Sequence, residues 1–254
     1  MMERLKLDGV DLSTLAVGDG PTVVMLHGLV FGSMATWYSG FALPLSVSRR
    51  VVLYDQRGHG DSGHAASGYD LDTQASDLAG VLAHYAPHDQ VDLVGHSMGA
   101  LIALHFAIRH PGHVRRLVLV DAPMPAAEYI APSFAGVTDP LKFDAFIDET
   151  TRSSVGGRRR AKLKDRLHTL FFDSTMVADV SAMHAESVHD LVQLALPTLL
   201  LYGADSPCRR AATTLRDALP DARLELMAGG HYLPEEAPAP LLAAIRDFLD
   251  GEAA

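Results

Sequence analysis

The stretch Gly95-His96-Ser97-Met98-Gly99 constrains the fold of this chain more than any other. A short, largely apolar run, Val91 to Val94, precedes it, and a helix-forming run, Ala100 to Ile108, follows it. A strand that turns at once into a helix leaves no room for a Cβ atom at the two glycines. It also places the serine above a helix N-terminus, whose free N–H groups carry partial positive charge. The pattern predicts that Ser97 projects from the carboxyl edge of a sheet.

The rest of the chain alternates between strands and helices. Loose alternation from Leu5 to Val17, with Asp8-Gly9 as the turn, predicts a β-hairpin. Further strands are expected at residues 22–26, 50–54, 116–120, 196–202 and 223–227, and helices at 34–45, 72–85, 208–219 and 238–249. Asp72 or Thr73 would cap the helix at 72–85. This order is typical of an α/β fold, so we expect a mostly parallel sheet with helices on both faces.

Residues 124–190 break this alternation, because they contain no strand-like run and show helical patterning at 141–149 and 161–172. We expect residues 1–123 and 191–254 to form one core, with a helical cap (lid) insertion at 124–190 over the carboxyl edge of the sheet. The insertion contains a basic cluster, Arg158-Arg159-Arg160 with Lys162, Lys164 and Arg166. It fits a solvated helix face, and a docking patch for an acyl-carrier domain or an anionic substrate is the alternative.

Composition narrows the classes of partner. The formal net charge of −10 disfavours binding to nucleic acid or to an anionic membrane. The single cysteine, Cys208, cannot form an internal disulfide, and neither a signal peptide nor a membrane-spanning run is evident, so a cytoplasmic protein is expected. The thirteen histidines show no convincing metal-ligand spacing, so we expect neither a metal nor a cofactor.

Four segments together resemble the α/β-hydrolase family. They are His27-Gly28-Leu29 after one strand, the glycine-rich loop Asp55 to Ser62 after the next, the turn at Ser97, and Gly229-Gly230-His231 after the last short strand. The resemblance covers nearly the whole chain and implies the α/β-hydrolase fold with acyl-transfer hydrolysis. Ser97 would be the nucleophile and His231 its general base. The backbone N–H groups of Leu29 and Met98 would form the oxyanion hole.

The third catalytic residue departs from the common pattern of the family. The family usually carries its acid three residues after the glycine that ends the seventh strand, and Ser206 stands at that place here. Asp205 lies one residue earlier. A subgroup of esterases with a similar turn takes its acid from the end of the sixth strand, which corresponds to Asp121. Asp121 is favoured as the acid, and Asp205 is the alternative.

The resemblance implies a serine hydrolase that cleaves a carboxylic ester of a small, largely apolar substrate through an acyl-enzyme. Thioester, lactone and C–C bond hydrolysis are alternatives within the family. A ligand-sensing protein, or a cofactor-free oxygenase in which His231 and Asp121 act as the base, remains open on the same fold. Phe31, Trp37 and Met124 are the expected pocket residues, and the side chains of Leu29 and Met98 would border the pocket.

Overall fold

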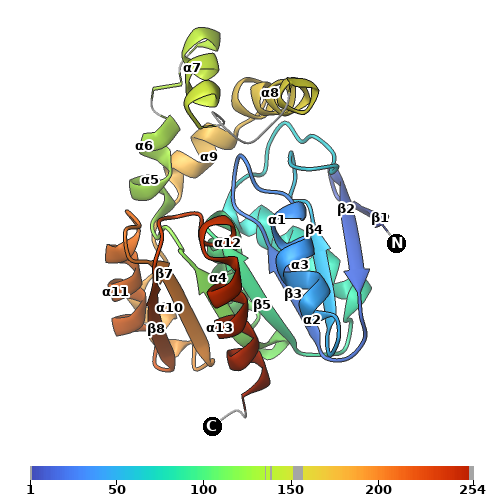
Figure 1. Ribbon diagram of the computed structural model, residues 1–254, viewed down its shortest axis with the longest axis vertical. Helices are drawn as coiled ribbons and strands as arrows, with labels where there is room; N and C mark the ends of the chain where they lie inside the picture. The colour runs from blue at the N-terminus through green and yellow to red at the C-terminus, as the bar shows by residue number, and fades with distance from the viewer. Residues whose placement is uncertain (1, 135, 138, 151–156, 252–254) are drawn as a thin grey trace.

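A computed structural model describes residues 2–134, 136–137, 139–150 and 157–251. They contain an eight-stranded sheet in the order β1-β2-β4-β3-β5-β6-β7-β8 (Figure 1). The strands are β1 (Met2–Leu7), β2 (Val10–Val17), β3 (Thr22–Leu26), β4 (Arg50–Tyr54), β5 (Val91–His96), β6 (Val114–Val120), β7 (Thr198–Gly203) and β8 (Ala222–Met227). Strands β1 and β2 form the predicted hairpin and pair antiparallel, whereas β4 through β8 form a parallel sheet with β3.

Helices cover both faces of this sheet, as predicted. On one face, α3 (Leu71–Tyr85), α4 (Met98–Arg109) and α11 (Arg209–Ala218) pack against the larger apolar core. On the other face lie α1 (Ala35–Trp37), a π-helical turn η1 (Tyr38–Ala42), α2 (Leu43–Leu45), α12 (Leu233–Glu236) and α13 (Pro238–Asp250). Because the inner strands are buried on both faces, they are continuous apolar runs, and their carboxyl ends are left free to carry functional loops.

Two local predictions need correction. The segment at 34–45 is not one regular helix, since the π-helical turn η1 separates two single turns of α-helix. The N-cap of α3 is Asp70 and neither Asp72 nor Thr73, because the Asp70 carboxylate accepts a hydrogen bond of 2.8 Å from the Thr73 N–H. Asp72 lies in the first turn, where its charge still complements the helix dipole.

Among the described residues between β6 and β7 there are six helices, which we call the helical insertion: α5 (Ala126–Tyr129), α6 (Ala131–Phe134), α7 (Pro140–Thr150), α8 (Gly157–Phe172), α9 (Met176–Ala182) and α10 (Val188–Gln193). In Figure 1, α5 to α9 form a group beyond one end of the sheet. Phe134, Phe143 and Phe171 pack together inside this group. The side chains of Arg158, Arg159 and Arg160 lie outside the described residues. No helix within the described ranges is long and apolar enough to cross a membrane.

Candidate active site

Ser97 lies at the tip of the turn between β5 and α4, with backbone angles of φ 54° and ψ −121°. A Cβ atom on Gly95 would come within 2.3 Å of the Gly99 carbonyl oxygen, and one on Gly99 within 2.5 Å of the Leu26 carbonyl oxygen. The turn is therefore possible only with glycine at both positions. The Ser97 N–H donates to the Val120 carbonyl, which ties the strained residue to the neighbouring strand.

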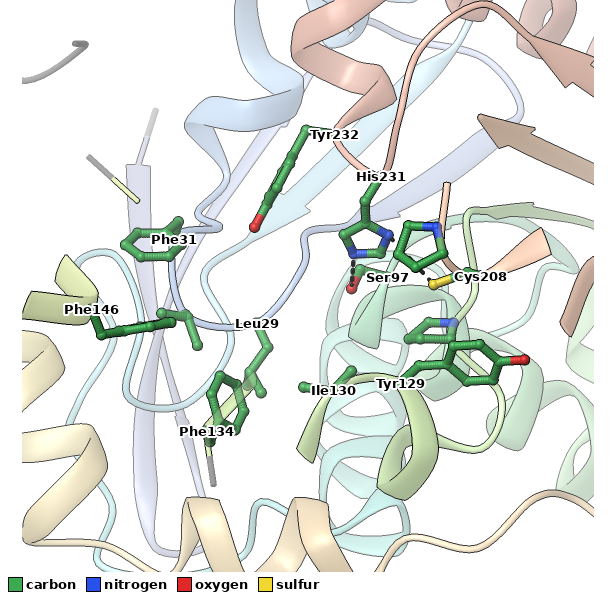
Figure 2. A pocket seen from close by; sticks show the side chains of 13 residues that line it. Leu29, Phe31, Ser97, Tyr129, Ile130, Phe134, Phe146, Cys208, His231 and Tyr232 are labelled. Atoms are coloured by element: carbon green, nitrogen blue, oxygen red, sulfur yellow. Dashed lines mark hydrogen bonds between the residues drawn. The ribbon is translucent and has the colours of Figure 1, made fainter. Parts of the chain in front are cut away.

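His231 follows β8 and contacts the serine directly. The Ser97 hydroxyl donates to its Nε2 atom over 2.9 Å (Figure 2). The loop is held on both sides of the ring, because the Glu236 carboxylate accepts hydrogen bonds from the Gly230 and Tyr232 N–H groups. His96 Nε2 donates to the His231 carbonyl oxygen over 2.8 Å, and burial lowers the pKa of His96 to about 4, which keeps that ring neutral. The imidazole thus faces Ser97 in a fixed orientation.

Asp121 is the carboxylate that meets the other side of the His231 ring. It is fully buried directly after β6, and its Oδ2 atom accepts from His231 Nδ1 over 2.5 Å. The Ser206 hydroxyl also donates to Oδ2 over 2.5 Å, and the Gly203 N–H donates to Oδ1 over 3.0 Å. Asp205 is exposed, and within the described chain its carboxylate makes no hydrogen bond to His231. The geometry brings Ser97, His231 and Asp121 into one line and leaves Asp205 outside it.

The loop that follows β3 lies against Ser97. A Cβ atom built on Gly28 would be 3.2 Å from the Ser97 Cβ atom. Two buried histidines hold this loop: His27 Nε2 accepts from the Gln56 N–H, and His59 Nε2 accepts from the Val30 N–H, each over 3.0 Å. Burial lowers the pKa of His27 to about 4 and that of His59 to about 3, so both rings are neutral acceptors at neutral pH.

The expected oxyanion donors are the backbone N–H groups of Leu29, in this loop, and of Met98, at the start of α4. Neither group donates a hydrogen bond to another residue in the part of the chain that the structure describes. They belong to the segments on either side of Ser97, and they remain free to bind an oxygen atom that develops negative charge.

A cavity of about 320 Å³ opens from Ser97 toward the helical insertion (Figure 2). The expected residues Leu29 and Phe31 line it. The helical insertion supplies further aromatic and aliphatic side chains that the sequence did not single out: Tyr129, Ile130, Phe134 and Phe146. No arginine, lysine or carboxylate lines this cavity among the described residues. The space beside the serine therefore has mostly apolar walls, with Ser97 and His231 among the few lining residues that carry hydrogen-bonding groups.

Three residues expected near the pocket lie elsewhere. Trp37 is fully buried against Phe41 on the opposite face of the sheet, because α1 packs on the far side. Met124 and Met98 are buried in the larger core and do not line the cavity. Of the two residues whose N–H groups would form the oxyanion hole, Leu29 lines the cavity and Met98 does not.

Cys208 lies beside His231, a position that the sequence does not predict. Its Sγ atom lies 3.7 Å from His231 Nδ1, and burial together with the nearby Asp121 charge raises the pKa of the thiol to about 12. Asp121, Cys208 and His231 could place one ligand atom each within 4.8 Å of one another. A protonated thiol is a poor metal ligand, and both other side chains are engaged in the chain of hydrogen bonds from Ser97, so this trio does not fit a metal.

A family model, curated relatives and solved structures were compared with this chain, and they agree on its fold. A family model described as alpha/beta hydrolase fold matches residues 21–163. The chain is 30% identical to 2-hydroxymuconate semialdehyde hydrolase from Pseudomonas sp. strain CF600, over 91% of this chain and 88% of the relative. It is 28% identical to sn-1-specific diacylglycerol lipase from Mus musculus, over 90% and 81% respectively. The crystal structure of bromoperoxidase from Bacillus anthracis superposes with a TM-score of 0.81 at 23% identity, covering 99% and 100% of the two chains.

Proposed function

Because the chain belongs to the α/β-hydrolase family, we propose that it is a serine hydrolase that cleaves carboxylic esters through an acyl-enzyme. Its relatives include hydrolases, so general α/β-hydrolase activity is supported. The single observation that carries the finer proposal is the continuous hydrogen-bond chain of 2.9 Å and 2.5 Å from Ser97 through His231 to Asp121. Ser97 and His231, at one end of these hydrogen bonds, line a largely apolar cavity.

The proposed mechanism follows from the protons in this chain of hydrogen bonds. The Ser97 oxygen attacks the ester carbonyl while His231 Nε2 takes its proton, and the Asp121 carboxylate stabilises the resulting imidazolium. The N–H groups of Leu29 and Met98 would stabilise the tetrahedral oxyanion. His231 then gives the proton to the leaving alcohol. A water molecule repeats the sequence on the acyl-enzyme and releases the acid.

The cavity supports a small, uncharged acyl group as the preferred substrate part. Four of its walls are the aromatic side chains of Phe31, Tyr129, Phe134 and Phe146. Three of these come from the helical insertion, which we propose acts as a cap over the site. Without a cation in the described lining, a carboxylate on the acyl part would lose its hydration without gaining a partner.

Cleavage of a C–C bond is the second candidate, because one relative at 30% identity is named as a semialdehyde hydrolase of 2-hydroxymuconate. The named substrate of that relative carries a carboxylate. The cavity of the present chain offers no arginine or lysine to such a group among the described residues, so ester cleavage is favoured. Thioesters and lactones present the same carbonyl chemistry to Ser97 and belong in the same substrate panel.

Two measurements test the proposal. Intact mass after brief exposure to a fluorophosphonate, with peptide mapping, should show one adduct on Ser97 in the natural protein and none in Ser97→Ala. A panel of p-nitrophenyl esters with neutral acyl chains of two to ten carbons should then show turnover. A folded protein that forms no adduct and hydrolyses no ester would contradict the proposal and favour ligand sensing. Activity that survives in Ser97→Ala would instead favour a cofactor-free oxygenase.

A further inference from the structure

A second, smaller cavity of about 50 Å³ also reaches Ser97 and His231. The two cavities share five lining residues: Leu29, Phe31, Ser97, His231 and Tyr232. They therefore meet beside Ser97 and His231. An ester carbonyl has two substituents, an acyl chain and an alcohol, so two cavities that meet at the nucleophile provide one space for each.

The walls of the two cavities differ in polarity. Apart from the shared residues, the larger cavity is lined mainly by aromatic and aliphatic side chains, and the helical insertion supplies Tyr129, Ile130, Phe134 and Phe146 among them. The smaller one is lined by Thr36, His96 and Glu235 in addition to Pro234 and two glycines. Of these, Glu235 carries the only formal charge in the described lining, since burial lowers the pKa of His96 to about 4 and leaves it neutral.

The Glu235 carboxylate is available to a ligand. It is exposed, and within the described residues it makes no hydrogen bond and no ion pair. Its neighbour Glu236 differs, because that carboxylate accepts hydrogen bonds from the Gly230 and Tyr232 N–H groups. Burial, aided by the charges of both carboxylates, raises the pKa of Tyr232, the residue that lines both cavities.

The smaller cavity suits the group that departs. The acyl part stays bound to Ser97 through both steps, whereas the alcohol must take a proton from His231 and then leave. Glu235, which lines the smaller cavity and not the larger one, is exposed, so the smaller cavity borders solvent. The larger cavity is instead walled by the helical insertion.

We propose that the alcohol part of the ester occupies the cavity between Thr36 and Tyr232, and that Glu235 selects cationic over neutral or anionic leaving groups. This inference rests on the proposed ester hydrolysis. Glu235 acts as a specificity-determining residue and takes no part in proton transfer. Because its carboxylate is exposed, the expected preference is modest, about fivefold in kcat/KM.

The test uses two esters that differ in one atom. Butyrylcholine and 3,3-dimethylbutyl butyrate have the same shape, but the first has a quaternary nitrogen where the second has carbon. The ratio of their kcat/KM values should be about five at low ionic strength and fall toward one in Glu235→Gln. It should also fall in about 0.5 M salt, where charges are screened within a few ångströms.

Two controls test whether the preference for a cationic ester comes from Glu235 itself. One controls for the net charge of the protein, and the other for which part of the ester occupies which cavity. Asp217→Asn removes an exposed negative charge near the far end of α11 and should leave the ratio unchanged. A second pair carries the charge on the acyl side, ethyl 4-(trimethylammonio)butyrate and ethyl 5,5-dimethylhexanoate. The neutral member should be preferred, because the larger cavity is apolar.

The outcomes distinguish the two proposals. Turnover of the neutral ester with a ratio near one, or a ratio that Glu235→Gln leaves unchanged, would refute the role of Glu235 while ester hydrolysis stands. A cation preference on the acyl side that disappears in Glu235→Gln would show that the two cavities are assigned in the wrong order. Failure to hydrolyse any member of either pair would overturn ester hydrolysis and this inference together.

Discussion

Replacement of Asp121 by asparagine should reduce kcat for ester hydrolysis about a thousandfold, whereas Asp205→Asn should change it by less than about twofold. The Asp121 carboxylate accepts hydrogen bonds from three donors: His231 Nδ1, Ser206 and the Gly203 N–H. An asparagine has one oxygen and one NH₂ group in place of the two carboxylate oxygens. Its NH₂ group cannot accept a hydrogen bond, yet it must face at least one of these donors. If the NH₂ group faces His231, the ring must carry its proton on Nε2, where it cannot accept the Ser97 proton.

The magnitude follows from the charge that is lost. Proton transfer creates an imidazolium beside a fully buried carboxylate, with His231 Nδ1 and Asp121 Oδ2 only 2.5 Å apart. Opposite unit charges about 4 Å apart interact by about 4 kcal/mol at an effective dielectric constant of 20. Loss of about 4 kcal/mol from the transition state corresponds to a factor of about 1,000 in rate. Asp205 is exposed, and the carboxylate that His231 Nδ1 contacts is that of Asp121, so neutralisation of Asp205 removes none of this interaction.

The assay is steady-state hydrolysis of a neutral p-nitrophenyl ester, with circular dichroism and thermal unfolding to confirm that both variants fold. Burst kinetics would separate acylation from deacylation, and both steps should slow in Asp121→Asn because His231 serves in each. Equal small losses in the two variants would refute the assignment of Asp121 as the acid. A large loss confined to Asp205→Asn would reverse the order of the two candidates.

Three further predictions concern the nucleophile, the turn and the buried histidines. Ser97→Ala and His231→Ala should each lower ester turnover by several orders of magnitude, and the double variant should lose little more, which steady-state rates would show. Gly99→Ala should lower the free energy of unfolding by at least about 1–3 kcal/mol in urea titrations, because the added Cβ would lie 2.5 Å from a carbonyl oxygen, whereas Gly40→Ala, with nothing within 4 Å, should not destabilise. The unfolding free energy should fall as pH drops from about 6.5 toward 4, because the unfolded chain binds protons that the folded chain excludes. The three rings that contribute are His27, His59 and His96. Together these three rings should lower the free energy of unfolding by about 4 kcal/mol for each pH unit in this range. His59→Gln should reduce that slope by about a third. An unfolding free energy that does not change with pH would contradict the reasoning.

Strand positions could be predicted closely because the inner strands are continuous apolar runs. The strands expected at 22–26 and 50–54 coincide with β3 and β4. The shorter helices of the insertion, such as α5 and α6 with four residues each, were not predicted because four residues contain too little of a helical repeat to recognise. The predicted cap of α3, Asp72 or Thr73, lies two or three residues after the observed cap, because Asp70, Asp72 and Thr73 are all suitable cap residues and only the backbone angles distinguish them.

The cavity could not be derived in the same way, because its walls come from segments far apart in the sequence. Phe31 and Trp37 are six residues apart, yet one lines the cavity and the other packs beneath the sheet. Nothing in the local pattern states which face a short helix will cover. The lining from Tyr129 and Phe134 depends on how the helical insertion docks, which is a matter of tertiary packing.

The choice between Asp121 and Asp205 as the proposed acid also depends on tertiary structure, because it depends on how two strands pair. Strands β6 and β7 are adjacent and parallel, with Val120 opposite Leu201, so Asp121 and the turn after Gly203 meet at one edge of the sheet. A carboxylate from either strand end could therefore approach the same imidazole, and sequence separation carries no information about which one does. Ser206, at the place where the family usually has its acid, donates its hydroxyl proton to Asp121 and accepts from the Cys208 N–H. The turn after β7 thus still supports the His231 ring, but through a neutral hydroxyl that stabilises the charge on the neighbouring strand. An aspartate at position 206 would place a second negative charge against Asp121, so Ser206→Asp alone should lower kcat for ester hydrolysis in steady-state assays.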